Sequence, residues 1–338
     1  MARMFGVDLG TDSLKFYERS TNQFHTEKSM IALRGRDEII AFGDEAWEIY
    51  GKAPEDIKVY TPIFRGVISQ IEHMEMLFYC VYHKAAKWRV FKGTKFCVAI
   101  PMDITEVSKR AILDMIADAG IHAREIFLVD RPLADAVGIG IDILSPGGSL
   151  IVNIGAAQTE VTMIASGGIV DSRLLLIGGK QINENIKNAV RKKENLVIGE
   201  KTAEQLKIAV GDAAGTAGRS LQIYGRSTIT GLPDSKTLDS AFLYEPISEV
   251  LYSIAEQIRL ILDKIPAEMS EDIVKNGVYI TGGSAELLNL GNYFARALNV
   301  KVNVANEPTG TVIRGIAAIL ANVKLRRELM YVPYEKTY

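Results

Sequence analysis

The residues best suited to chemistry follow the first apolar run of the chain, residues 5–9. Gly10 and Thr11 end this run, and Ser13 and Lys15 come directly after it. Glycine lets a backbone approach a phosphate closely because it has no Cβ. Hydroxyl groups can donate hydrogen bonds to a phosphate, and lysine supplies a point charge that suits it. These residue types at this spacing predict a turn that binds the phosphates of a nucleotide.

Asp8 precedes this turn and is a candidate metal ligand. Mg²⁺ in proteins favours one or two carboxylates together with phosphate oxygens, and it keeps several waters. Asp8 could therefore hold Mg²⁺ through water, although binding of this metal stays an open question. A tight hairpin without any ligand is the alternative interpretation of residues 8–11.

The same layout of strand, turn and strand recurs in the middle of the chain. An apolar strand beginning at Leu150 enters a turn at Gly155, and a second strand follows at residues 160–165. A third apolar strand runs into Gly282 and Gly283. Turns at strand ends can point backbone amides at a phosphate. The repeated hairpin predicts a duplicated architecture with a cleft between its halves.

Strand and helix signals alternate between these turns. Strands are expected at residues 98–100 and 125–129. A helix is expected at residues 105–119 and another at Pro132, which suits a first helical turn. The apolar face of the first helix is expected to contain Val107, Ala111, Ile112, Met115 and Ile116. This order is typical of an α/β sheet covered by helices.

The second half of the chain adds a smaller subdomain and long helices. Residues 218–239 are rich in Gly, Ser and Thr, which indicates short strands and turns. Amphipathic helices are expected at residues 249–264 and 315–327.

Composition excludes several classes of protein. The 338 residues are 48% hydrophobic and 24% charged, which is typical of a globular protein. The net charge of −2 argues against a nucleic-acid binder. Cys80 and Cys97 lie in apolar stretches, which excludes a disulfide scaffold and favours a reduced, cytoplasmic setting. We expect neither a signal peptide nor a membrane-spanning segment, which needs roughly 18 apolar residues.

Taken in order, the motifs resemble the MreB family of bacterial actin homologues, within the superfamily of actin and heat-shock-chaperone ATPases. Residues 8–11 are similar to the first phosphate loop of the family, and residues 281–283 are similar to its adenosine motif. Residues 198–204, with Lys207, are similar to its most characteristic stretch. The resemblance implies an α/β, actin-like duplicated fold, in which each half has a larger mixed-sheet subdomain and a smaller subdomain around a nucleotide cleft.

This resemblance also implies domain bounds and ligands. Residues 1–142 would form the first half, with subdomains IA and IB. Residues 143–314 would form the second, with subdomain IIB at about 180–245, and 315–338 a C-terminal helix and tail returning to the first half. ATP or ADP is the expected cofactor. The residues expected to bind it are Gly10, Thr11, Asp12, Ser13, Lys15, Gly155, Ala156, Ala157, Gln158, Thr159, Glu204, Lys207, Gly282, Gly283 and Ser284.

Glu204 and Lys207 are expected to contact the adenosine. Their spacing places them on one face of a helix. A surface ion pair on that helix is the alternative interpretation.

The second phosphate loop departs from the family pattern of Asp, three glycines and Thr. Asn153 replaces the Asp, Ala156 and Ala157 replace glycines, and Gln158 replaces a small hydroxyl residue. The methyl groups restrict the approach of the backbone to a phosphate. Gln158 could intrude on the phosphate space.

The expected catalytic carboxylate is also replaced. A glutamate that positions the attacking water precedes the helix-opening proline in the family, whereas Arg131 precedes Pro132 here. Arginine stays protonated and cannot act as a base. The neighbouring Asp130 is expected to point elsewhere. These changes leave only Asp8 of the expected carboxylates, and we assign no catalytic residue.

A basic and aromatic segment follows the helix that starts near Gln70. Trp88, Val90 and Phe91 are expected at the membrane, where a short apolar loop of the family inserts. Five cations surround them, Lys84, Lys87, Arg89, Lys92 and Lys95. Each cation adds roughly 1 kcal/mol near anionic lipid, and aromatic rings favour the interface. Alternatively, Trp88 and Phe91 cap the core between helix and strand.

The sequence thus predicts an MreB-like cytoskeletal protein that assembles into filaments, with impaired or absent hydrolysis of ATP. Its expected partners are itself, a conventional MreB, membrane-bound shape proteins and lipid at the inner face of the cell membrane. Two alternatives stay open, an active ATPase and a monomeric nucleotide-dependent adaptor of the same fold.

Overall fold

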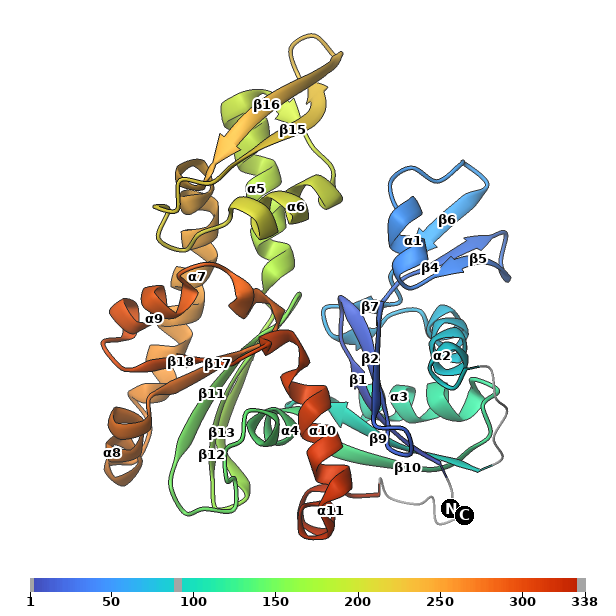
Figure 1. Cartoon of the computed structure of the whole chain (residues 1–338), viewed down its shortest axis with the longest axis vertical. Coiled ribbons are helices and arrows are strands. Elements are labelled where there is room, and N and C mark those ends of the chain that lie inside the picture. Colours follow the sequence, from blue (N-terminus) through green and yellow to red (C-terminus); the bar gives the residue numbers. More distant parts are fainter. Residues whose placement is uncertain (1–2, 88–92, 333–338) are drawn as a thin grey trace. The chain divides into compact units, whose positions relative to one another are not determined.

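A computed structural model describes residues 3–87 and 93–332 (Figure 1). The chain divides into two compact units. The first comprises Met1–Pro146, Ile164–Ile169 and Gly310–Tyr338, and the second comprises Gly147–Met163 and Val170–Thr309. The subdomain bounds expected from the sequence stay predictions.

The first unit is built on a mixed five-stranded sheet. Its order is β10 (Ala123–Asp130), β9 (Thr94–Ile100), β1 (Met4–Leu9), β2 (Ser13–Glu18) and β3 (Gln23–Lys28). Strands β10, β9 and β1 run parallel to one another, whereas β1, β2 and β3 pair antiparallel. The carboxyl ends of the three parallel strands therefore meet at one edge, which is where ligands bind in open α/β sheets.

The two faces of this sheet have different neighbours. Phe5, Val7 and Leu9 alternate along β1 and join a core with residues of α2 (Ile71–Ala85) and α3 (Glu106–Asp118). A Cβ on Gly6 would lie 2.5 Å from Ile316 on helix α10 (Thr311–Ala321). Since side chains alternate along a strand, Asp8 shares the face of Gly6.

Two helices of the first unit cross at unusually close range. A Cβ on Gly138, at the end of α4 (Arg131–Gly138), would overlap the carbonyl oxygen of Thr311 on α10. A Cβ on Gly315 would likewise overlap the carbonyl oxygen of Ala134. Glycine is thus required at both positions for these helices to pack as they do.

The second unit repeats the strand order of the first. Its sheet has the order β18 (Val302–Val304), β17 (Val278–Thr281), β11 (Ser149–Ile154), β12 (Thr159–Ala165) and β13 (Gly168–Leu175). These strands correspond in turn to β10, β9, β1, β2 and β3 of the first sheet. Strands β11, β17 and β18 pair in parallel. The two hairpins predicted from the sequence, β1–β2 and β11–β12, hold corresponding places in the two sheets, which confirms the duplicated α/β architecture.

Smaller elements complete each unit. The first unit adds a three-stranded sheet in the order β5 (Glu38–Phe42), β4 (Ile31–Arg34) and β6 (Ile57–Tyr60), and a two-stranded sheet of β7 (Ile63–Phe64) and β8 (Val67–Ile68). It also adds two short helices, α1 (Asp44–Ile49) and α11 (Val323–Leu329). The second unit adds β14 (Leu196–Val197) with β15 (Ser220–Ser227) and β16 (Pro233–Asp239), and helices α5 (Gly179–Glu194), α6 (Glu200–Val210), α7 (Ser240–Leu262), α8 (Ala267–Asn276) and α9 (Leu290–Leu298). Short 3₁₀ turns η1 and η2 span Gly283–Glu286 and Pro308–Gly310.

Three expectations about helices are wrong in detail. Helix α7 begins at Ser240 and not near residue 249, because Asp239 caps it by accepting from the Phe242 amide and Pro246 is accommodated inside it. The helix expected at 315–327 is two helices, because Asn322 ends α10 and its side chain caps α11.

The third error concerns the apolar face of α3. Ile112, Met115 and Ile116 are buried, but Val107 is 80% exposed. At about 100° per residue, Val107 lies about 140° around the helix from Ile112. It therefore faces away from the buried stripe.

Candidate functional site

Strand pairing places two predicted site residues opposite each other in the first unit. Asp8 on β1 is the direct cross-strand partner of Lys15 on β2. The Lys15 Nζ donates to Asp8 Oδ2 at 3.2 Å, and both side chains are about nine-tenths buried. The hairpin therefore brings Lys15 to the Asp8 carboxylate.

A third charged group reaches the same carboxylate from a distant part of the sequence. Arg131 begins α4 at the carboxyl end of β10, and its Nε lies 3.8 Å from Asp8 Oδ1. Its Nη2 donates to the carbonyl oxygen of Leu9 at 3.4 Å. The side chain of Arg131 is 12% exposed. Asp8, Lys15 and Arg131 thus form one buried charged cluster, named the Asp8 cluster here.

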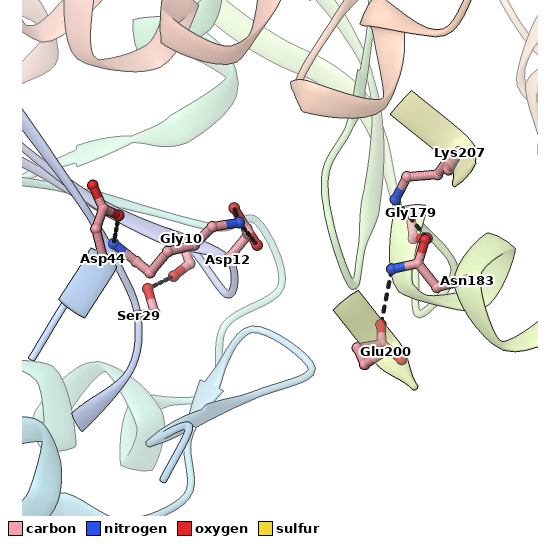
Figure 2. A network of polar contacts seen from close by, with 9 residues as sticks. Gly10, Asp12, Ser29, Asp44, Gly179, Asn183, Glu200 and Lys207 are labelled. Atoms are coloured by element: carbon pink, nitrogen blue, oxygen red, sulfur yellow. Dashed lines mark hydrogen bonds and ion pairs between the residues drawn. The ribbon is translucent and has the colours of Figure 1, made fainter. Parts of the chain in front are cut away.

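The turn after β1 is held by backbone and hydroxyl contacts. The Gly10 amide donates to the Ser13 carbonyl at 3.1 Å, and a Cβ on Gly10 would lie 2.6 Å from the same oxygen. The Ser29 hydroxyl donates to the Gly10 carbonyl at 2.6 Å (Figure 2). The Thr11 hydroxyl accepts from the amide of Gly66, in the turn between β7 and β8, at 3.2 Å. Sequence reasoning did not predict these contacts of Ser29 and Gly66, since neither residue is near this turn along the chain.

Asp12, a predicted nucleotide contact, is engaged by a lysine. Lys28 Nζ donates to both carboxylate oxygens of Asp12, at 2.9 and 3.0 Å. The same ammonium lies over the ring of Trp47, and the Lys28 amide donates to Asp44 Oδ1 at 3.2 Å (Figure 2). The negative charge of Asp12, which would repel a phosphate, is balanced by this ion pair.

Asp130, the neighbour of Arg131, forms a hydrogen bond outside the Asp8 cluster. Its Oδ1 accepts from the hydroxyl of Tyr331 at 3.1 Å. Burial, followed by the nearby charge of Asp130, raises the pKa of Tyr331. Tyr331 therefore keeps its proton and its hydrogen bond to Asp130 at neutral pH.

The predicted loop of the second unit is closed against helix α5. The Gly155 amide donates to the Gln158 carbonyl at 2.8 Å, which forms the turn. The amides of Gly179 and Lys180 donate to the carbonyls of Gly155 and Ala156, at 3.0 and 2.7 Å. Within the described residues, the amides of Ala156 and Ala157 donate to no acceptor. The loop thus keeps two backbone donors for an anion.

Three separate elements meet at this loop. The Ser284 hydroxyl, from η1, donates to the Gly155 carbonyl at 3.1 Å. Lys207 Nζ, from α6, donates to the Gly179 carbonyl at 3.2 Å (Figure 2). A Cβ on Gly179 would lie 2.8 Å from the Ser284 hydroxyl oxygen and 3.2 Å from Lys207 Nζ. The missing side chain of Gly179 therefore lets α5, α6 and η1 approach one another.

The remaining predicted residues of the second unit lie around this meeting point. Asn153 pairs with Thr281 across β11 and β17, and a Cβ on Gly282 would lie 2.8 Å from Asn153 Oδ1. Gly283 begins η1. The buried Thr159 hydroxyl donates to the Ile177 carbonyl at 2.8 Å. Glu204 lies half-buried on α6, three positions before Lys207, and its role at the adenosine stays a prediction.

A contact that sequence reasoning missed orders α5 and α6. The Asn183 amide nitrogen donates to Glu200 Oε1 at 2.8 Å (Figure 2). Glu200 also accepts from Lys187 at 3.1 Å. Asn183 is buried, so this bond fixes the first turn of α6 against α5.

Two expectations concern metal and membrane. In the described part of the chain, no three His, Cys, Asp or Glu side chains are grouped so that they could hold a metal ion. Among residues 3–87 and 93–332, no helix is both long and apolar enough to cross a membrane. Trp88, Val90 and Phe91 lie outside the described residues. Of the flanking cations, Lys84 pairs with Glu27 and Lys95 with Glu125, each at 2.6 Å.

Comparison of sequences identifies relatives over almost the whole chain. The MreB/Mbl protein family matches residues 2–328. The cell shape-determining protein Mbl of Bacillus cereus is 32% identical over 324 residues, which are 95% of this chain and 97% of that protein. The cell shape-determining protein MreB of Escherichia coli K12 is 33% identical over 318 residues, 91% of this chain and 90% of that protein.

Comparison of structures agrees. MreB5 of Spiroplasma citri bound to ADP superposes with a TM-score of 0.90 at 28% identity, covering 97% of this chain and 98% of that one. A MamK double helical filament superposes with a TM-score of 0.78 at 21% identity, covering 96% and 100%, and so shares the fold. The repeated sheets, the two phosphate-type turns and these relatives together show that the chain belongs to the MreB/Mbl family of actin-like proteins.

Proposed function

We propose that this chain is a cell-shape cytoskeletal protein that binds ATP or ADP, assembles into filaments and hydrolyses ATP far more slowly than relatives with both carboxylates. Family membership supports the cytoskeletal role, since the curated relatives are cell shape-determining proteins. Filament assembly follows from the resemblance to MreB.

Nucleotide binding is supported from two sides. MreB5 of Spiroplasma citri has been solved with ADP and with AMPPNP. In this chain, the turn at Gly10 is tight, since a Cβ there would lie 2.6 Å from the Ser13 carbonyl oxygen, and the turn at Gly155 has two amide donors at Ala156 and Ala157. Backbone amides at strand ends are suited to hold phosphate oxygens.

The single observation that supports slow hydrolysis is the position of Arg131 beside Asp8. Where the family has a glutamate that positions water, a buried guanidinium lies 3.8 Å from Asp8. Phosphoryl transfer to water needs an oriented water molecule and charge stabilisation. Arg131 can supply charge but cannot accept a proton. Asp130 accepts from Tyr331 instead, and Asn153 carries no charge.

Phosphate release and sedimentation, measured on one preparation, test this proposal. We expect the protein to pellet above a critical concentration while releasing phosphate far more slowly than an MreB that has both carboxylates. Comparable release would establish the active ATPase. Failure to pellet at any concentration, with nucleotide still bound, would establish the monomeric adaptor.

The location and partners of the protein are proposed on the sequence alone. We propose attachment to the inner face of the cell membrane through Trp88, Val90 and Phe91. Assembly beside a conventional MreB and with membrane-bound shape proteins is part of the same proposal.

A further inference from the structure

We propose that Lys15 and Arg131 take the place of a divalent cation, so that the Asp8 cluster binds the phosphates of a nucleotide without Mg²⁺. This inference rests on the proposed nucleotide site and specifies how its first half works. It depends on three features of the cluster. Both oxygens of Asp8 face a cation, the net charge is positive, and Asp8 is the one carboxylate in the cluster.

Both oxygens of Asp8 already face a cation. Lys15 Nζ lies 3.2 Å from Oδ2, and Arg131 Nε lies 3.8 Å from Oδ1. All three side chains are between 8% and 12% exposed, so water screens them little. A metal ion that used Asp8, directly or through water, would have to enter beside two buried positive charges.

The charge balance also opposes a metal. One carboxylate and two cations give the Asp8 cluster a net charge of +1. Mg²⁺ sites with phosphate ligands usually include one or two carboxylates that are available to the metal or its waters. Asp8 is the one carboxylate of this cluster, and both of its oxygens already face a cation. The donor set therefore does not fit Mg²⁺.

The same charge balance suits a polyphosphate. Arginine presents a planar fork of donors that matches phosphate oxygens, and lysine binds phosphate as a point charge. The bond from Arg131 Nη2 to the Leu9 carbonyl holds the guanidinium at the end of β1, directly before Gly10. Asp8 keeps both cations in place, and an arriving phosphate competes with it for them.

Calorimetric binding of ADP and of inorganic tripolyphosphate, each with Mg²⁺ and with EDTA, tests the inference. We expect EDTA to change either affinity by less than about threefold, because no metal bridges the anion. A loss of about tenfold or more in EDTA for tripolyphosphate would overturn the inference. Absence of tripolyphosphate binding in both buffers would also overturn it. Binding of tripolyphosphate without ADP would instead reject the proposed nucleotide function and leave the Asp8 cluster as an anion site.

Variants distinguish phosphate binding by Lys15 and Arg131 from phosphate binding through Mg²⁺ on Asp8. Asp8→Asn should keep or increase the affinity for tripolyphosphate, since the carboxylate no longer competes for Lys15 and Arg131. If Asp8 bound Mg²⁺, the same variant would lose affinity in the magnesium buffer, and that result would overturn the inference. Lys15→Gln should weaken binding equally in both buffers.

Matched controls guard against unfolding. Lys95→Gln removes a cation from the same unit, where Lys95 pairs with Glu125 and not with the Asp8 cluster. It should bind as the unchanged protein does. Thermal unfolding of every variant is measured alongside, and Asp8→Asn carries the test if Lys15→Gln does not fold.

Discussion

Arg131 changes both the charge and the chemistry around Asp8. It reaches the carboxylate from the end of β10, while Lys15 reaches it across the β1–β2 hairpin. Two largely buried cations therefore share one carboxylate, and at the position of one of them, Arg131, the resemblance leads us to expect a glutamate. Under the proposed function, this cluster would stabilise bound phosphate without a base to activate water, so that binding and turnover would be separated at the level of single residues.

The first prediction restores the missing carboxylates. We expect Asn153→Asp combined with Arg131→Glu to raise phosphate release more than either single change does. The resemblance implies that both groups act on one water and one metal, and residues that act together are usually non-additive. Phosphate release is measured at saturating ATP and Mg²⁺. Equal, independent effects of the two changes would argue against a shared catalytic role.

The two cysteines provide a second prediction at this scale. Burial raises the pKa of the Cys80 thiol to about 11 and that of Cys97 to about 12. Since the thiolate is the reactive form and becomes scarcer as the pKa rises, alkylation of the folded protein at pH 8 should be slower by about a hundredfold or more than in denaturant. Mass spectrometry after timed iodoacetamide treatment measures this. Rapid labelling of the native protein would show that these strands and helices open readily.

At the scale of elements, the crossing of α4 and α10 depends on two glycines. At Gly138 and at Gly315, the missing side chain leaves room for a backbone carbonyl of the other helix. Arg131 begins α4, and Ile316 of α10 packs over Gly6 on β1. The crossing therefore supports the strand that carries Asp8.

We expect Gly315→Ala to lower the free energy of unfolding by about 1–3 kcal/mol, because its Cβ would overlap the Ala134 carbonyl and force the helices apart. Urea unfolding measures the change. Gly168→Ala is the matched control, since the nearest atom to its Cβ would be 3.9 Å away. That control should change the free energy by less than about 0.5 kcal/mol. Equal effects of the two variants would show that the close crossing is not required.

The segment after α2 carries the membrane prediction. Lys84 and Lys95 are held in ion pairs with Glu27 and Glu125, so fewer cations are left for lipid than the sequence indicates. Replacing Trp88 and Phe91 with Ser should therefore reduce co-pelleting with anionic liposomes clearly, since apolar insertion must supply more of the binding. Unchanged co-pelleting of the folded variant at low salt would assign both residues to the core or to a protein contact.

At the scale of the whole molecule, the question is how much the nucleotide controls assembly. A ligand favours one conformation only by its differential affinity for it. Ala156, Ala157 and Gln158 should weaken that preference for triphosphate, so assembly must draw more on contacts between copies of the chain. On this proposal, the protein would form filaments in which the nucleotide has a reduced regulatory role.

We expect the critical concentration for pelleting to be similar with ADP, ATP and AMPPNP, and to rise only modestly without nucleotide. Sedimentation over a concentration series in each condition measures it. Assembly that occurs only with ATP and reverses as phosphate is released would contradict this prediction. It would also mean that Asp8 and Lys15 belong to a working hydrolytic site.

Local patterns in the sequence were sufficient for the repeated hairpins and the order of strands and helices. An apolar run that ends in glycine specifies a strand and a turn at both Gly10 and Gly155, because side-chain period and turn chemistry act over a few residues. The pattern failed where capping overrode it, as at Asp239 and Asn322. The change of Glu to Arg131 was likewise visible in the sequence, since the following Pro132 marks its position.

Only the tertiary structure decided which groups meet. Arg131 lies 123 positions from Asp8, and Gly66 lies 55 from Thr11. The contact of Arg131 with Asp8 depends on parallel strands whose carboxyl ends gather at one edge of the sheet. The contact of Gly66 with Thr11 depends on how the separate β7–β8 pair packs beside that edge. The Lys28–Asp12 pair and the approach of Lys207 and Ser284 to Gly179 likewise depend on packing between separate elements. Sequence patterns specify elements through short-range sterics and hydrophobicity, whereas charged partners are set by long-range strand pairing and helix packing, which no local pattern contains.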